Sequence, residues 1–118
     1  MQLGDTFILG EGGHLRIVIS DPTKHSGCYV IVNLTKDWKR AGKECELNPG
    51  DHKWITERCW VSFGDALEVT PIEESRIAQY MKAGQIKQHL PISGPILQKI
   101  LAAAVQSKAL APKFKKYL

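Results

Sequence analysis

Apolar and polar residues alternate through most of the first 70 residues of the chain. Successive side chains of a β-strand point to opposite faces of a sheet, so this period of two predicts strands. The expected strands cover residues 4–9, 14–20, 28–35, 44–47, 58–63 and 66–70. The glycines of the segment Gly10-Glu11-Gly12-Gly13 predict a hairpin turn, and Asp21-Pro22 ends the second strand because proline cannot donate to a ladder.

The alternation also predicts which face of each strand is apolar. Three of the expected strands each have an apolar face, formed by Leu15, Ile17 and Ile19, by Val30, Val32 and Leu34, and by Cys59, Val61 and Phe63. The other face of the second strand carries His14, Arg16, Val18 and Ser20, and is therefore the face with polar groups.

The hydrophobic period becomes helical after Pro71. A short helix is expected from Pro71 to about Gly84, and a second from Ser93 as N-cap to Gln106. The apolar face expected for the first helix consists of Ile72, Ile77, Tyr80 and Met81. That of the second consists of Ile96, Leu97, Ile100, Leu101, Ala104 and Val105. Residues 85–90 are ambiguous between strand and loop. Strands followed by helices predict an α+β fold in one domain, 1–118, with 107–118 as a flexible basic tail.

Composition and charge narrow the picture only slightly. The net charge of +4 and the pI near 9.0 permit a polyanionic partner without requiring one. The chain has neither a long apolar run nor a signal-like N-terminus, so we expect a cytoplasmic protein with no membrane span. Three cysteines without a C-x-x-C pair suggest reduced thiols. Cys45, His52 and Cys59 match no standard metal-ligand spacing, so we expect neither a metal nor another cofactor.

Candidate chemistry gathers in residues 50–63 and 36–43. His52 follows Asp51 in an Asn-Pro-Gly-Asp turn, and an imidazole can act as base or acid near pH 7. A surface histidine beside a turn is the alternative. Lys53 and Trp54 follow it. The loop 36–43 carries Lys36, Trp38, Lys39 and Arg40, which suits a mobile binding loop or an ordinary solvated one.

The order of these segments resembles that of the PemK/MazF-like toxins of bacterial toxin–antitoxin systems. The resemblance is carried by the Gly4-Asp5 opening, a glycine loop, HLRIVISDP, VIVNLT, a turn, RCWVSF with ALEVT, and LPISGPIL before the last helix. The family implies a small SH3-like β-barrel of five to six strands, here followed by one short and one longer C-terminal helix. It also implies a homodimer, an antitoxin partner and metal-independent cleavage of single-stranded RNA.

The resemblance also suggests site residues. Thr35 matches the family's polar residue at the end of the VIVNLT strand, and His14 stands where many members have an arginine. Arg16 follows two positions later, so alternation places it on the face of His14. The predicted catalytic residues are therefore His14, Arg16, Thr35 and His52.

Residues in the loops extend the predicted site toward the RNA. The residues expected to bind RNA are Lys36, Trp38, Lys39, Arg40, Asp51, Lys53 and Trp54, with Trp38 and Trp54 stacking on bases. The family's arginine-proline start of the second strand is missing, and Trp60 and Ser62 replace its R-x-D-like element. A non-catalytic barrel that binds a protein partner or RNA is the alternative function.

Overall fold

The computed structural model of the chain describes residues 1–9 and 13–118. It is an α+β fold, as the pattern predicts, built on one antiparallel sheet of six strands in the order β4-β5-β3-β2-β1-β6. The strands are β1 Thr6–Leu9, β2 Leu15–Val18, β3 Tyr29–Thr35, β4 Glu46–Leu47, β5 Cys59–Val69 and β6 Ile86–His89. The helices are the 3₁₀ turn η1 Pro22–Lys24 and α1 Trp38–Ala41, α2 Pro71–Lys82, α3 Gly94–Gln106 and α4 Pro112–Lys115.

The predicted hairpin between the first two strands is present. β1 pairs antiparallel with β2, with Thr6 opposite Ile17 and Ile8 opposite Leu15. The predicted glycine turn at Gly10, Glu11 and Gly12 lies outside the described residues. The ambiguous segment 85–90 contains β6, which pairs with β1 at the edge of the sheet.

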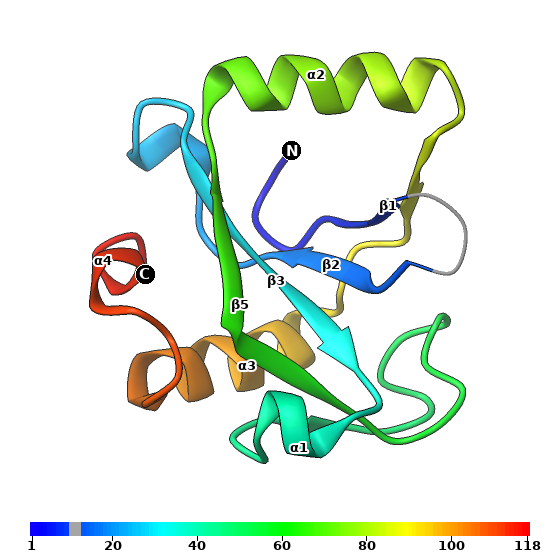
Figure 1. Cartoon of the computed structure of the whole chain (residues 1–118), viewed down its shortest axis with the longest axis vertical. Helices are drawn as coiled ribbons and strands as arrows, with labels where there is room; N and C mark the ends of the chain where they lie inside the picture. The colour runs from blue at the N-terminus through cyan, green and yellow to red at the C-terminus, as the bar shows by residue number, and fades with distance from the viewer. Residues whose placement is uncertain (10–12) are drawn as a thin grey trace.

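β5 is one long strand where two were expected. The prediction of separate strands at 58–63 and 66–70 is wrong, because β5 continues through Gly64 and Asp65. The pairing with β3 changes register there: Asn33 lies opposite Ser62, whereas Ile31 lies opposite Leu67. One residue of β3 thus faces four residues of β5, and such an insertion bends a strand. Figure 1 shows the bend about halfway along β5.

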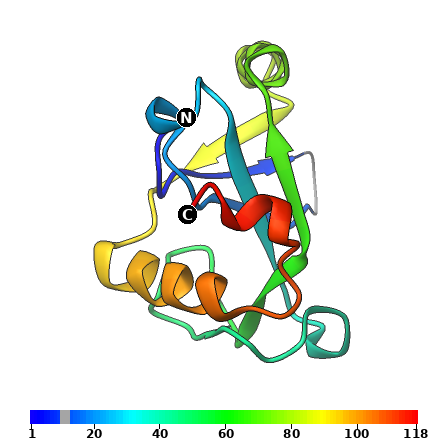
Figure 2. The same cartoon turned by 90° about the vertical axis from the view of Figure 1, so that its left-hand side faces the viewer.

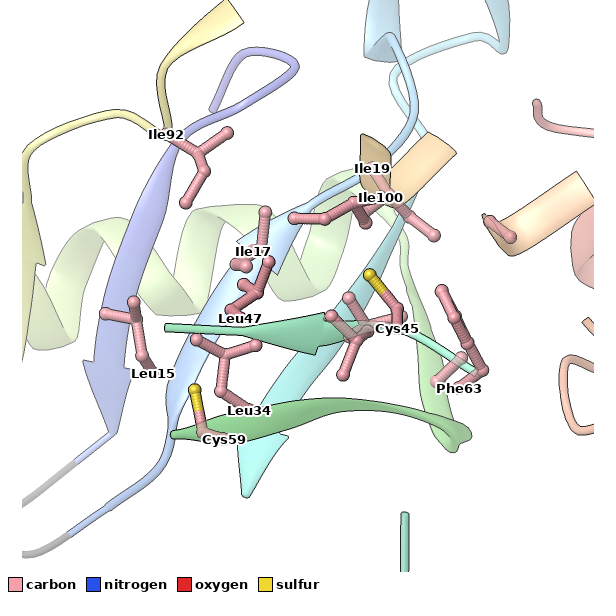
Figure 3. Packing of buried hydrophobic residues seen from close by; sticks show 14 of the residues in the cluster. Leu15, Ile17, Ile19, Leu34, Cys45, Leu47, Cys59, Phe63, Ile92 and Ile100 are labelled. Atoms are coloured by element: carbon pink, nitrogen blue, oxygen red, sulfur yellow. The ribbon is translucent and has the colours of Figure 1, made fainter. Parts of the chain in front are cut away.

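One face of the curled sheet encloses the larger core. It contains every side chain of the three predicted apolar faces, together with Cys45, Leu47, Ile92, Ile100 and Ala104. Figure 3 shows Leu15 and Ile17 of β2, Leu34 of β3 and Cys59 of β5 turned into this cluster. The alternation rule therefore identifies the main core correctly.

The other face of the sheet is covered by α2. Phe7, Val18, Tyr29, Ile31, Val69 and Ile86 form a second cluster, against which Ile77 and Met81 of the helix pack. A capping box between Thr70 and Glu73 begins α2, and Gly84 follows its end with φ +77°. Ile72 and Tyr80, which were expected on the buried face, are 70% and 49% exposed.

The C-terminal segment is packed on the body of the protein. Leu110 is 2% exposed and, with Phe114 and Tyr117, belongs to or packs on the larger core. Ser107 Oγ donates to Glu44 Oε1 at 2.7 Å, and Lys108 N donates to Glu44 Oε2 at 2.8 Å. Figure 2 shows α4 lying close to α3 and the sheet. This arrangement differs from the flexible tail expected for 107–118, because that expectation rested on its lysines and not on its apolar residues.

The loop 36–43 also contains structure that the sequence did not suggest. Asp37 accepts a hydrogen bond from Lys39 N and caps α1, a single turn of helix. Among the described residues, no helix is long and apolar enough to cross a membrane.

Candidate functional site

A cavity of about 350 Å³ lies where β2 begins and β3 ends. It brings together four of the predicted site residues, His14, Thr35, Lys36 and Trp54, from three segments that are distant in sequence. Its lining is Gly13, His14, Leu34, Thr35, Lys36, Asp37, Trp54 and Cys59. We refer to it as the β2–β3 cavity.

The inner wall of the β2–β3 cavity is apolar. Leu34 and Cys59 are at most 1% exposed and belong to the larger core, and the half-buried Trp54 packs against the same cluster. Burial raises the pKa of the Cys59 thiol to about 11, so the sulfur is neutral at physiological pH. A flat apolar group can therefore pack against Leu34, Cys59 and Trp54 without meeting a charge.

The outer wall of the cavity is polar and is formed by Thr35 and Lys36. Thr35 Oγ1 accepts from Asp37 N at 3.1 Å, and no described residue accepts the hydroxyl hydrogen. Lys36 Nζ lies 3.5 Å from Glu57 Oε1, and both side chains are more than half exposed. An exposed ion pair of this kind is weak and easily exchanged for another anion. The wall thus offers a hydroxyl donor and an ammonium group.

His14 and Arg16 do not point into the same cavity. His14 is exposed and lines the β2–β3 cavity, whereas Arg16 lines a different cavity beneath α2. His14 precedes the first residue of β2 and so is not constrained by the pleat that the alternation argument assumed. The two side chains line different cavities, yet the Asp65 carboxylate is close enough to act electrostatically on both, so their predicted place on one face stays a prediction.

A polar row crosses the sheet beside Arg16. Arg16 lies opposite Asn33, and Asn33 lies opposite Ser62. Ser62 Oγ donates to Asp65 Oδ2 at 2.6 Å, and Arg40 Nε donates to the same oxygen at 3.2 Å. These hydrogen bonds, with the charges of Arg40 and His14 nearby, hold the pKa of Asp65 below its usual value.

Sequence reasoning missed Asn33, Ser62 and Asp65 as parts of one cluster. Residues 64 and 65 separate two expected strands in the sequence. In the structure they belong to β5, and the register change there brings Asp65 within hydrogen-bond distance of Ser62. Two atoms of the row, Arg16 Nε and Asn33 Oδ1, are buried with no hydrogen-bond partner among the described residues. Burial lowers the pKa of Arg16, which Asp65 partly opposes, yet a guanidinium stays charged in a protein.

His52 is buried and tied to the backbone at both ring nitrogens. Its side chain is 7% exposed, Nε2 lies 2.6 Å from Leu90 O, and Nδ1 accepts from Trp54 N at 3.0 Å. These contacts require the tautomer with hydrogen on Nε2. The ring joins the loop before β5 to the segment after β6, and it does not line the β2–β3 cavity. The geometry thus gives His52 a structural position instead of the predicted place on the rim.

The remaining predicted RNA-binding residues lie outside the lining of the β2–β3 cavity. Trp38 is 44% exposed, and Lys43 Nζ lies 4.3 Å from its ring centroid. Lys39 and Lys53 are exposed, and Arg40 pairs with Asp65. Asp51 Oδ2 accepts from Asn48 N at 2.8 Å and closes the predicted turn, in which Gly50 has φ +100°. Trp60, which replaces part of the family's R-x-D-like element, is 4% exposed and therefore packed within the protein.

Comparison with models of known protein families finds no match, and comparison with curated protein sequences finds none either. The resemblance to PemK/MazF-like toxins therefore stays a prediction. Among residues 1–9 and 13–118, no group of three or more histidine, cysteine or acidic side chains could hold a metal ion.

We predict that His52→Ala lowers the free energy of unfolding by about 1–3 kcal/mol, because Trp54 N loses its acceptor and Leu90 O keeps only the hydrogen bond from Thr6 Oγ1. Urea unfolding followed by tryptophan fluorescence measures the change. Lys53→Ala, one residue away and exposed, is the matched control and should change stability by less than about 0.5 kcal/mol. Equal stabilities of the two variants would contradict the structural position of His52.

We predict that Asp65→Asn destabilises the protein by about 1–2 kcal/mol at neutral pH. Folding lowers the pKa of Asp65, so its contribution is present above the ordinary value of 3.8 and disappears as the pH falls through the lower, folded value. The gap between wild type and variant should therefore close in acid. Urea unfolding at a series of pH values, with Glu57→Gln as an exposed control, measures it; a gap that widens in acid would contradict the assignment.

Proposed function

We propose that the chain is a toxin-like, metal-independent endoribonuclease that binds single-stranded RNA in the β2–β3 cavity. The observation that supports the proposal is the meeting of His14, Thr35, Lys36 and Trp54 in one cavity. A proton acceptor, a hydroxyl donor, a cation and an aromatic ring are the groups that cleavage of a single strand needs.

In the proposed reaction, His14 accepts the proton of the ribose 2′-hydroxyl, and the 2′-oxygen attacks phosphorus. The bond from phosphorus to the 5′-oxygen breaks, and that oxygen takes a proton from the Lys36 ammonium. Thr35 donates a hydrogen bond to a phosphate oxygen whose negative charge grows during the attack. The products are a 2′,3′-cyclic phosphate and a 5′-hydroxyl.

The proposal assigns binding of the bases to Trp54 and the apolar wall. Stacking on an aromatic ring contributes about 1–3 kcal/mol per base without sequence preference. Lys39 and Lys53 are exposed cations outside the cavity, and the chain carries a net charge of +4, which favours a polyanion.

The curled antiparallel sheet is compatible with the SH3-like barrel that the resemblance implies, and we include that architecture in the proposal. An antitoxin protein and a second copy of the chain are the partners that such a toxin would have. The backbone hydrogen bonds of His52 favour the alternative function, a non-catalytic module, because they leave the cavity with a single histidine.

Incubation of the purified protein with a fluorescent single-stranded RNA of mixed sequence, in EDTA, tests the proposal. We expect fragments that end in 2′,3′-cyclic phosphate, and a rate lower by about 10²–10⁴-fold for His14→Ala, since that is the usual contribution of a general base. His89→Ala is the matched control, because this histidine lies on β6 and outside the cavity lining; it should cut at the wild-type rate.

Intact RNA after incubation with the folded wild type would exclude catalysis. If that RNA is nevertheless bound, and Trp54→Ala weakens the binding, the non-catalytic alternative holds. Equal loss of cleavage in both histidine variants would contradict the role given to His14.

A further inference from the structure

A second cavity, also of about 350 Å³, lies between α2 and the sheet and shares no lining residue with the β2–β3 cavity. Its innermost side chains are Phe7, Ile31, Val69 and Ile86, which are at most 4% exposed. Figure 1 shows α2 running above β1, from the end of β5 to the chain that leads into β6. We call this cavity the α2 groove.

The rim of the α2 groove is apolar and open to solvent. Leu9, Leu67 and Tyr80 line it and are 41%, 52% and 49% exposed. Exposed large apolar side chains around a closed apolar floor are typical of a site that binds another molecule. A volume of this size lies at the small end of ligand pockets, which measure roughly 300–1,000 Å³.

The fold supplies hydrogen-bond partners to the acidic residues of the α2 groove but no ion-pair partner to its arginines. Both acidic side chains accept hydrogen bonds within the fold: Glu68 Oε2 from the Tyr117 hydroxyl at 2.6 Å, and Glu73 Oε1 from Thr70 Oγ1 at 3.0 Å. The two arginines that line the groove, Arg16 and Arg76, form no ion pair within residues 1–9 and 13–118. Both carboxylates keep their charge, but these hydrogen bonds hold their oxygens on partners in the fold, whereas the two guanidinium groups are left for an anion in the groove.

One nitrogen of Arg16 also lacks a hydrogen-bond partner. Its Nε is buried without a hydrogen-bond acceptor among the described residues, and leaving such a donor unpaired is costly. A guanidinium presents several donors in a planar fork that matches the two oxygens of a carboxylate. The buried Nε is itself out of reach of a ligand, so a carboxylate in the groove would pair with the terminal nitrogens of this guanidinium and add to the more distant charge of Asp65.

We propose that the α2 groove binds a small apolar carboxylate, with its hydrocarbon body on Phe7, Ile31 and Val69 and its carboxylate at Arg16 and Arg76. The closed floor and the modest volume favour a small molecule over a macromolecular segment. The floor has no polar side chain for a sugar, which favours a plain hydrocarbon body over a nucleotide. The proposal is independent of RNA cleavage.

Titration of the ¹⁵N-labelled protein with octanoate, followed by amide chemical shifts, tests the proposal. We expect saturable shifts centred on Leu9, Leu67 and Tyr80 with a Kd of about 1 mM, which is reasonable for so small a ligand. Lengthening the chain from hexanoate to octanoate should tighten binding by up to about fourfold per methylene. Octylamine has the same chain and the opposite charge, and should not bind the groove.

Variants separate the charge contribution from the apolar one. Arg16→Gln and Arg76→Gln should each weaken octanoate at least about fivefold, because each removes a charged hydrogen-bond donor. Lys87→Gln, an exposed cation on β6 outside the groove, is the matched control and should bind like wild type. The amide spectra of the unliganded variants show whether each is folded.

Several results would overturn the proposal. One is equal binding of octylamine, and another is weakening by Lys87→Gln as large as that by Arg76→Gln. A third is the absence of groove shifts with octanoate. Sedimentation of the same samples measures whether the chain forms a dimer. A dimer that buries the groove amides and excludes octanoate would assign this surface to a second copy of the chain and overturn the proposal.

Discussion

β5 pairs with β3 in two registers, and this change of register determines how the sheet curls. Opposite the single residue Val32, β5 carries the four residues Phe63 to Ala66, and the insertion turns the strand. As a result, one strand supplies Val61 and Phe63 to the larger core and Val69 to the cluster under α2. The bend thus lets a single sheet enclose one core and support a helix on its other face.

The curl of the sheet also determines where the two cavities lie. The β2–β3 cavity opens where one strand begins and another ends, and the α2 groove opens on the helix-covered face, so the two sites have separate linings. Their nearest link along the chain is the pair His14 and Arg16, two residues apart but in different cavities. Between the cavities, the insertion in β5 places Asp65 over Ser62 and beside Arg40. The Asp65 carboxylate offsets the positive charges of Arg40 and Arg16, which would otherwise repel one another.

Local pattern predicts the parts of this structure that depend on local forces. Alternation in β2, β3 and β5 identifies the main core, and the turn at 48–51 follows from its residue types. The rest depends on contacts between distant segments. His52 lies in a loop whose sequence suggests a solvated rim, yet its partner Leu90 is 38 residues away. The register change in β5 leaves no periodic signal, because Gly64-Asp65 is equally typical of a turn.

We propose that RNA binds in the β2–β3 cavity. Mapping the amide shifts of the ¹⁵N-labelled protein on titration with a 2′-O-methyl single-stranded RNA tests it most directly, because this RNA has no free 2′-hydroxyl and stays intact. We expect the largest shifts at the amides of His14, Thr35, Lys36 and Trp54. Largest shifts at Leu67 and Tyr80 instead, or no saturable shifts at all, would contradict it.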